Sequence, residues 1–274
     1  MDIESAFINL KDKLSLVSSS VRLDSELLLM KSLNVSRAHL YTHKEENLTK
    51  DQKETLARLC QRRMLNEPMA YILGKKEFWS REFKVSYATL IPRPESEMLV
   101  EEVLKSTLKT EKKKILELGT GSGAIAISIA LERANTTVIA SDISMAALEI
   151  AKCNGEKYDT KNISFYESNW FSGIQEKNFD YIVCNPPYIK TSDPALSELK
   201  FEPIEALTSG KDGLDAIRHI ALNAKSHLNK NGILFLEHGK DQEYEVKRIL
   251  ESGGWEDIKC TYDLRGFPRI IMAK

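Results

Sequence analysis

The chain has 274 residues, of which 42% are hydrophobic and 29% are charged, the balance of an ordinary globular protein. Its formal net charge of −1 gives no overall basic field of the kind that marks nucleic-acid binders. Four widely spaced cysteines predict neither a zinc site nor a disulfide framework and favour a reducing compartment. We find no secretory signal and no run of the roughly 20 apolar residues that a membrane span needs, and we therefore expect a soluble, cytoplasmic protein.

Residues 1–73 carry helical patterns and no strand signal. Asp24-Ser25-Glu26 precedes the apolar run LLLMKSL, which predicts a helix beginning there, and Thr49 and Gln52 have the spacing of a capping box ahead of another helix. His39 and His43 stand four residues apart without a third ligand nearby, so we expect surface residues and no metal site. The region predicts a small, all-helical N-terminal domain.

A second pattern begins after Pro68, and residues 74–90 alternate aromatic and charged side chains around Gly74. This alternation predicts a β-hairpin linker. Arg93, Glu95 and Glu97 follow, and we expect them to hold the linker near the active site, in a role that is either structural or functional.

Residues 91–274 alternate short apolar strands with helical stretches, the pattern of a doubly wound, parallel α/β sheet. The predicted strands are 114–118, 137–141, 163–166, 179–184, 232–238 and 269–273, and the predicted helices are 123–134, 145–154, 213–228 and 241–252.

A glycine loop, Gly119-Thr120-Gly121-Ser122-Gly123, follows the first of these strands and opens a helix. Such a loop lets the backbone approach a ligand at a helix N-terminus. Asp142 closes the next strand, 19 residues after Gly123, where a carboxylate can accept hydrogen bonds from a ribose diol. The same residues also satisfy the fingerprint of a nicotinamide or flavin site. Glu117 favours S-adenosylmethionine instead, because its carboxylate can meet the positively charged methionine end of that molecule.

The string Asn185-Pro186-Pro187-Tyr188, here called the NPPY loop, follows the strand 179–184. Prolines cannot continue a sheet ladder, so the backbone is rigid at the carboxyl edge of the sheet, where open α/β folds bind ligands. The Asn185 side chain and the Pro186 carbonyl offer two acceptors for one NH₂ group, and Tyr188 can stack on a flat π-system. The loop therefore suits a planar nitrogen nucleophile, which is a carboxamide or the amino group of adenine or cytosine.

The chain closely resembles the HemK/PrmC family of protein-glutamine methyltransferases, which act on bacterial peptide chain release factors. The matching stretches extend through nearly the whole chain and lie at 67–78, 90–104, 116–130, 141–154, 168–171, 183–189, 201–207 and 236–239. The resemblance implies a helical substrate-recognition domain (1–73), a hairpin linker (74–90) and a seven-stranded, Rossmann-like, S-adenosylmethionine-dependent methyltransferase domain (91–274). The family often has glutamine where Glu67 stands and threonine where Ser96 stands, and we expect both positions to lie outside the core site.

The resemblance also implies roles for single residues. The cofactor would be bound by Gly119, Thr120, Gly121, Ser122 and Gly123, its ribose by Asp142 and its adenine by Trp170. Asn185 would contact cofactor and substrate, and Asn185, Pro186, Pro187 and Tyr188 would hold the glutamine of the Gly-Gly-Gln tip of the release factor. The products would be N5-methylglutamine and S-adenosylhomocysteine.

Several alternatives remain open from the sequence. The chain could methylate a glutamine of a ribosomal protein or an adenine of a nucleic acid, although the net charge and the lack of a target-recognition domain argue against direct nucleic-acid binding. A cofactor-binding regulator and a nicotinamide oxidoreductase are further alternatives. Trp170 and Cys184 could simply be core residues. Glu202, a loop carboxylate before proline, is expected to be solvated.

Overall fold

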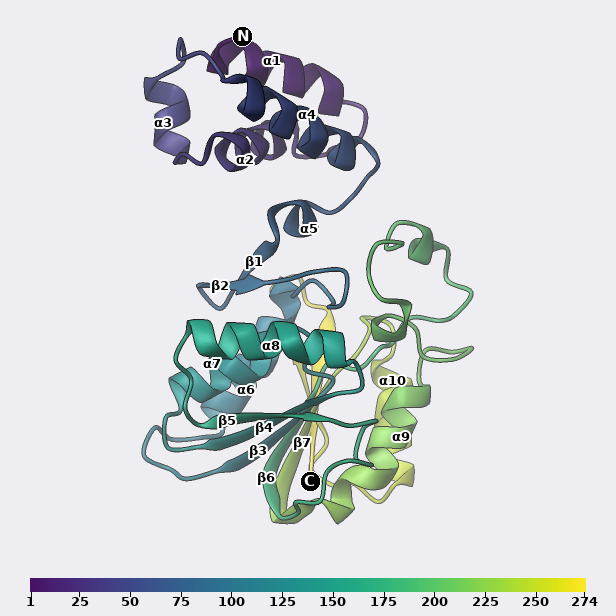
Figure 1. Cartoon of the computed structure of the whole chain (residues 1–274). Helices are drawn as coiled ribbons and strands as arrows, with labels where there is room; N and C mark the ends of the chain where they lie inside the picture. The colour runs from purple at the N-terminus through teal and green to yellow at the C-terminus, as the bar shows by residue number, and fades with distance from the viewer. The chain divides into compact units, whose positions relative to one another are not determined.

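A computed structural model describes the whole chain, residues 1–274, and divides it into two compact units, Met1–Lys75 and Lys76–Lys274. The first unit is built from helices, as the sequence predicts (Figure 1). These are α1 (Ile3–Leu14), α2 (Val21–Leu33), α3 (Arg37–Thr42), α4 (Lys50–Met64) and α5 (Met69–Leu73). Their apolar faces enclose a leucine-rich core that includes Leu14, Leu28 and Leu29. No helix of either unit has both the length and the apolar composition to cross a membrane.

The capping box predicted at α4 is present. The Thr49 hydroxyl accepts a hydrogen bond from the Gln52 amide at 3.2 Å, and the Gln52 side chain accepts one from the Thr49 amide at 2.8 Å. Helix α2, in contrast, begins at Val21 and not at Asp24. Asp24 is buried and accepts hydrogen bonds from Ser18, Ser20 and Arg63, so it links the α1–α2 turn to α4 instead of capping a helix.

The hairpin expected from the sequence consists of β1 (Lys75–Phe78) and β2 (Arg81–Lys84). Its two turn residues, Trp79 and Ser80, both have positive φ, at 51° and 55°, as two-residue turns with two left-handed positions require. Phe78 and Phe83 are buried in a core of the second unit. The Trp79 amide donates to the Glu97 carboxylate at 2.7 Å, which fixes the turn to the helix that follows.

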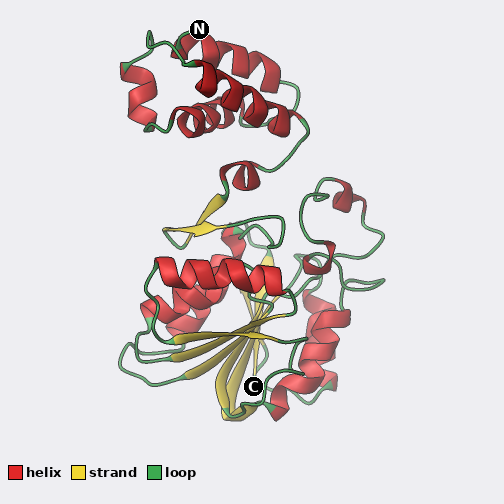
Figure 2. Ribbon diagram, viewed as in Figure 1, coloured by secondary structure: helices red, strands yellow, loops and turns green.

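The second unit contains one seven-stranded sheet with helices on both faces (Figure 2). The strand order is β5-β4-β3-β6-β7-β9-β8, and all neighbours are parallel except that β9 runs antiparallel to β7 and β8. The strands are β3 (Lys114–Leu118), β4 (Thr137–Asp142), β5 (Ile163–Glu167), β6 (Phe179–Cys184), β7 (Leu228–Glu237), β8 (Lys259–Tyr262) and β9 (Pro268–Ala273). Strand β8 was not predicted. The doubly wound α/β fold is therefore confirmed, with an antiparallel strand near one edge.

Helices α6 (Glu97–Lys105), α7 (Ala124–Glu132) and α8 (Met145–Lys157) lie over one face of the sheet, and α9 (Asp215–Asn223) and α10 (Glu243–Ser252) lie over the other (Figure 1). Each face has its own apolar core because successive strand residues point to opposite sides. Ile115, for example, joins the core under α6 and α7, while Leu116 joins the core under α9 and α10. Short 3-10 turns complete the unit at Pro94–Ser96 (η1), Pro194–Ser197 (η2), Ile204–Ala206 (η3) and Ala224–Ser226 (η4).

Candidate functional site

The sheet has a topological switch point between β3 and β6. From β3 the chain passes to β4 and β5 on one side and then returns to β6 on the other side. Leu118 at the end of β3 pairs with Cys184 at the end of β6, and also with Ser141 near the end of β4. The loops that follow these strands therefore leave the same edge side by side. Open α/β sheets bind ligands at this kind of crevice.

The glycine loop occupies the β3 end of the crevice. Gly121 has a φ of +55°, and a Cβ added there would meet nothing within 4 Å, so the space beside its backbone is open to a ligand. Its amide donates to the Asp142 Oδ2 atom at 2.8 Å. Gly123 has a different role, since an added Cβ would lie 2.8 Å from Ile127 Cδ1 and 3.2 Å from Ala151 Cβ. Gly119, like Gly121, would meet nothing, so the loop combines two open positions with one at which two helices pack closely.

Glu117 lies beneath the glycine loop with only 1% of its surface exposed. Its Oε2 atom accepts hydrogen bonds from the Thr120 hydroxyl at 2.5 Å and the Ala126 amide at 3.2 Å, so it fastens the loop to α7. Burial raises the pKa of Glu117 to about 8, and the charge of Asp142 adds to this rise. A cationic ligand in the crevice would stabilise the ionised carboxylate.

Asp142 ends β4 and Trp170 follows β5, on the side of the glycine loop away from β6. Burial raises the pKa of Asp142, whose Oδ1 atom accepts a hydrogen bond from the Ser144 amide at 2.9 Å. The Ser168 amide donates to the Asp142 carbonyl at 2.9 Å, which brings the segment after β5 to this acid. Trp170 itself has a positive φ of 53°, is half-buried and packs with its ring centroid 6.3 Å from that of His219 in α9. Contact of Trp170 with an adenine stays a prediction.

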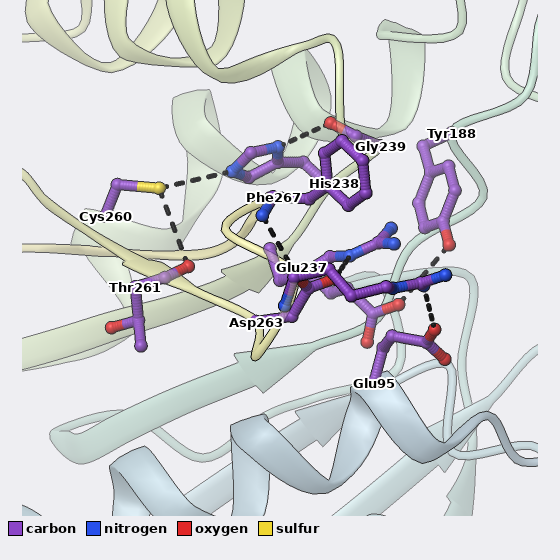
Figure 3. Close-up of polar contacts among 11 residues, drawn as sticks. Glu95, Tyr188, Glu237, His238, Gly239, Cys260, Thr261, Asp263 and Phe267 are labelled. Carbon is purple, nitrogen blue, oxygen red and sulfur yellow. Dashed lines mark hydrogen bonds and ion pairs between the residues drawn. The ribbon is translucent and has the colours of Figure 1, made fainter.

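The NPPY loop occupies the β6 end of the crevice and is held at both ends. The Asn185 Nδ2 atom lies 2.9 Å from the Ser96 hydroxyl oxygen. The Tyr188 hydroxyl donates to Glu237 Oε1 at 3.3 Å, as Figure 3 shows. The Gln242 side chain donates to the Tyr188 carbonyl at 3.0 Å. Cys184, just before the loop, is fully buried, as expected of a core residue.

Two of these partners correct the sequence analysis, since Ser96 was expected to lie outside the core site and Glu237 was not singled out. Glu237 ends β7, the strand next to β6, where Cys184 pairs with Leu236. It is 1% exposed, and burial raises its pKa to about 7. The signal that could have found it is the one that found Asp142, an acid closing an apolar strand at the carboxyl edge. Ser96 gives no such signal because it precedes α6, far from Asn185 in the sequence.

Glu202 corrects another expectation, because it is buried and not solvated. Its carboxylate accepts hydrogen bonds from the Ile91 amide at 3.0 Å and from Arg93 at 2.5 Å. Two nearby acids make further links: Glu95 accepts from Arg265 at 3.1 Å, and Glu97 holds the hairpin turn. The segment that carries Ser96 is therefore fixed on several sides, and Figure 3 shows Glu95 beside the Tyr188–Glu237 pair.

Comparisons with known proteins agree with this geometry. Residues 6–74 match the family model of the PrmC N-terminal domain, and residues 95–200 match that of the methyltransferase small domain. A release factor glutamine methyltransferase of Coxiella burnetii is 46% identical over 274 residues, which cover 100% of this chain and 99% of the relative. Another, from Xylella fastidiosa, is 42% identical over 92% of this chain and 93% of the relative.

A solved methyltransferase structure from Pyrococcus furiosus superposes with a TM-score of 0.55 at 18% identity, covering 79% of this chain and 98% of that one. This likeness shows the fold alone. The two curated relatives, in contrast, match over nearly their whole length at more than 40% identity. The chain therefore belongs to the family of release factor glutamine methyltransferases.

Proposed function

We propose that this chain transfers a methyl group from S-adenosylmethionine to the side-chain amide nitrogen of the glutamine in the Gly-Gly-Gln motif of peptide chain release factors. The products are N5-methylglutamine and S-adenosylhomocysteine. The observation that carries the proposal is the position of the NPPY loop directly beside the glycine loop at the switch point, in a chain that matches its relatives over its full length. A methyl donor and a planar amide can meet there.

The crevice fits S-adenosylmethionine, which supplies an electrophilic methyl group on a positively charged sulfur when bound. The open backbone at Gly121 admits a ligand, and the carboxyl groups of Glu117 and Asp142, which hold the loop by hydrogen bonds, can offset positive charge on that ligand when they are ionised. We assign the cofactor to the loop from Gly119 to Gly123 with the side chains around it. The full set is Glu117, Gly119, Thr120, Gly121, Ser122, Gly123, Asp142, Trp170 and Asn185.

The substrate amide is assigned to the NPPY loop. The Asn185 Oδ1 atom and the Pro186 carbonyl accept hydrogen bonds from the two N–H bonds of the amide, while Pro187 and Tyr188 form the wall around it. Two acceptors raise the electron density on a nitrogen whose lone pair is delocalised, and they hold it in one position. Positioning of this kind lowers the barrier of a transfer reaction by several kcal/mol, up to about 7–11 in well-oriented cases. No side-chain base is required, since the proton leaves after the new N–C bond forms.

The three parts of the chain take separate tasks in this proposal. Residues 1–73 recognise the body of the release factor, residues 74–90 are the linker, and residues 91–274 bind the cofactor and carry out the transfer. A glutamine on a flexible tip needs such a second contact, because the tip alone offers little surface. The enzyme acts in the cytoplasm, where release factors work, without direct contact with nucleic acid or membrane.

Transfer of labelled methyl from S-adenosylmethionine to purified release factor tests the proposal. Parallel reactions contain ribosomal proteins or DNA and RNA, and an Asn185→Ala variant serves as control. We expect label in the release factor only, and its loss in the variant. Label in ribosomal protein or nucleic acid but not in the release factor would assign a different substrate, and tight binding of NAD in place of S-adenosylmethionine would contradict the reaction itself.

A further inference from the structure

Tyr188 closes the NPPY loop, and its carbonyl group is held by a side chain from another part of the chain. The Gln242 Nε2 atom donates to the Tyr188 carbonyl at 3.0 Å and to the Gly213 carbonyl at 3.4 Å. The Gln242 Oε1 atom accepts from the Gly239 amide at 2.9 Å. One side-chain amide therefore joins three segments, of which two follow β6 and β7 and the third precedes α9.

These three partners fix which way the Gln242 carboxamide points. A backbone N–H group only donates and a backbone carbonyl only accepts. The Gly239 amide must therefore face the Gln242 oxygen, and the two carbonyl groups must face its nitrogen. The backbone of Gln242 is fixed as well, because its amide donates to the Gly239 carbonyl at 3.0 Å and its carbonyl accepts from the Val246 amide at 2.9 Å. The side chain thus extends from a rigid point where α10 begins.

The space around Tyr188 is as restricted as its hydrogen bonding. A Cβ added to Gly213 would lie 2.3 Å from the Tyr188 carbonyl oxygen, and one added to Gly239 would lie 3.5 Å from Tyr188 Cδ2. Figure 3 shows Gly239 beside the Tyr188 ring. At the end of the ring the hydroxyl donates to Glu237 Oε1 at 3.3 Å. Tyr188 is therefore enclosed by the segment before α9 and the turn after β7.

We propose that Gln242 is a positioning residue, which sets the place of the NPPY loop by holding its Tyr188 end. The inference rests on the proposed function for the identity of the substrate amide. Each proline of the loop fixes one backbone dihedral, so a shift at Tyr188 is passed on to the Pro186 carbonyl, one of the two acceptors assigned to that amide. A misplacement of about 1 Å can slow a transfer by as much as about 100-fold. Loss of the Gln242 contact should therefore slow the reaction.

Two variants separate the donor of Gln242 from its acceptor. Gln242→Glu keeps an oxygen for the Gly239 amide but turns a second oxygen toward the two carbonyl groups, whereas Gln242→Ala removes both functions. Asn162 provides a matched control, because its Nδ2 atom donates to three backbone carbonyl groups at 3.0, 3.1 and 3.2 Å. It lies just before β5, at the amino ends of the parallel strands and so away from the site. Asn162→Asp removes an equivalent donor there.

Kinetics on purified release factor give the first test. We expect kcat to fall about tenfold in Gln242→Glu and Gln242→Ala, the effect of about one lost hydrogen bond, with the KM for S-adenosylmethionine changed by less than about twofold. Asn162→Asp should keep kcat within about twofold of the wild type. A wild-type kcat in Gln242→Glu would overturn the proposal. An equal fall in Asn162→Asp would also overturn it, because a general loss of stability would then explain the effect.

A second measurement needs no substrate. Hydrogen exchange followed by NMR compares the Gly239 amide with the Ile189 amide, which follows Tyr188 and donates to the Leu207 carbonyl at 2.9 Å. In Gln242→Glu only the Ile189 amide should exchange faster, and in Gln242→Ala both should. Equal Ile189 rates in the wild type and both variants would refute the role of Gln242. If the wild type fails to methylate release factor, the proposed function fails, while these rates still decide whether Gln242 holds the loop.

Discussion

Two glycines of the same loop should respond very differently to the same substitution. Gly121 and Gly123 both have positive φ, +55° and +79°, so alanine at either costs about 1–2 kcal/mol of folding free energy from backbone strain. Only at Gly123 does the new Cβ meet close neighbours, 2.8 Å from Ile127 Cδ1 and 3.2 Å from Ala151 Cβ. Overpacking of this kind adds about 1–3 kcal/mol.

The difference between the two variants isolates the packing contact. At about 2–4 °C per kcal/mol for a unit of this size, Gly123→Ala should melt about 6 °C below Gly121→Ala. The assay is thermal unfolding of both variants in the same buffer without ligand. Equal melting temperatures would refute the reasoning, because they would mean that Ile127 and Ala151 give way at no cost.

The affinity for S-adenosylmethionine should fall more in Gly121→Ala than in Gly123→Ala, the reverse of the order in stability. The Cβ of Gly121→Ala enters the open space that we assign to S-adenosylmethionine, so this variant should bind the cofactor more weakly than its modest loss of stability suggests. Calorimetric titration with S-adenosylmethionine measures this. Wild-type affinity in Gly121→Ala would show that the ligand does not approach the loop there.

Three further predictions concern single contacts elsewhere. Glu202→Ala leaves the Ile91 amide unpaired and releases Arg93, whose side chain is 33% exposed. Denaturant unfolding should therefore show that the free energy of unfolding falls by about 1–3 kcal/mol. A fall of less than about 0.5 kcal/mol would mean that water replaces the carboxylate. Thr49→Ala removes the capping box of α4 and should cost about 1 kcal/mol in the same assay, whereas an unchanged midpoint would contradict the cap. Because burial raises the pKa of Glu117 from 4.5 to about 8, the folded chain holds a proton that the unfolded chain releases, and stability falls as the pH rises between these values. Glu117→Gln should flatten that fall in unfolding midpoints measured from about pH 5 to pH 8, and an unaltered slope would refute the assignment.

The sheet was predictable where its strands are buried on both faces. Strands β3 (KILEL) and β6 (FDYIVC) are mostly apolar, and all but one residue of each is buried, because both faces meet a core. Strand β8 escaped prediction because it lies at one edge of the sheet, carries the polar sequence KCTY and is only partly covered. The start of α2 was wrongly predicted for a different reason. Asp24 has the chemistry of a helix cap, but it bonds to Arg63 of another helix, which the local sequence does not reveal.

The site was predictable wherever a motif lies on one loop. The glycine loop, Asp142 and the NPPY loop can each be recognised from a short stretch of sequence. The parallel strands that precede them bring all three to one edge of the sheet. Glu202 was expected to be solvated because nothing around it in the sequence reveals Ile91 and Arg93, which approach from a distant segment. The Ser96–Asn185 contact depends in the same way on tertiary structure, since it joins residues 89 positions apart.

Tandem mass spectrometry of the tip peptide of release factor, after incubation with this enzyme and S-adenosylmethionine, tests the central claim most directly. Fragment ions locate the added methyl group to one residue, and a release factor with glutamate in place of the tip glutamine is the matched control. The account predicts a methyl group on the glutamine side chain of the Gly-Gly-Gln motif, absent from the glutamate control and from the reaction with Asn185→Ala. A methyl group at another residue, or an unmodified tip with active enzyme, would contradict it.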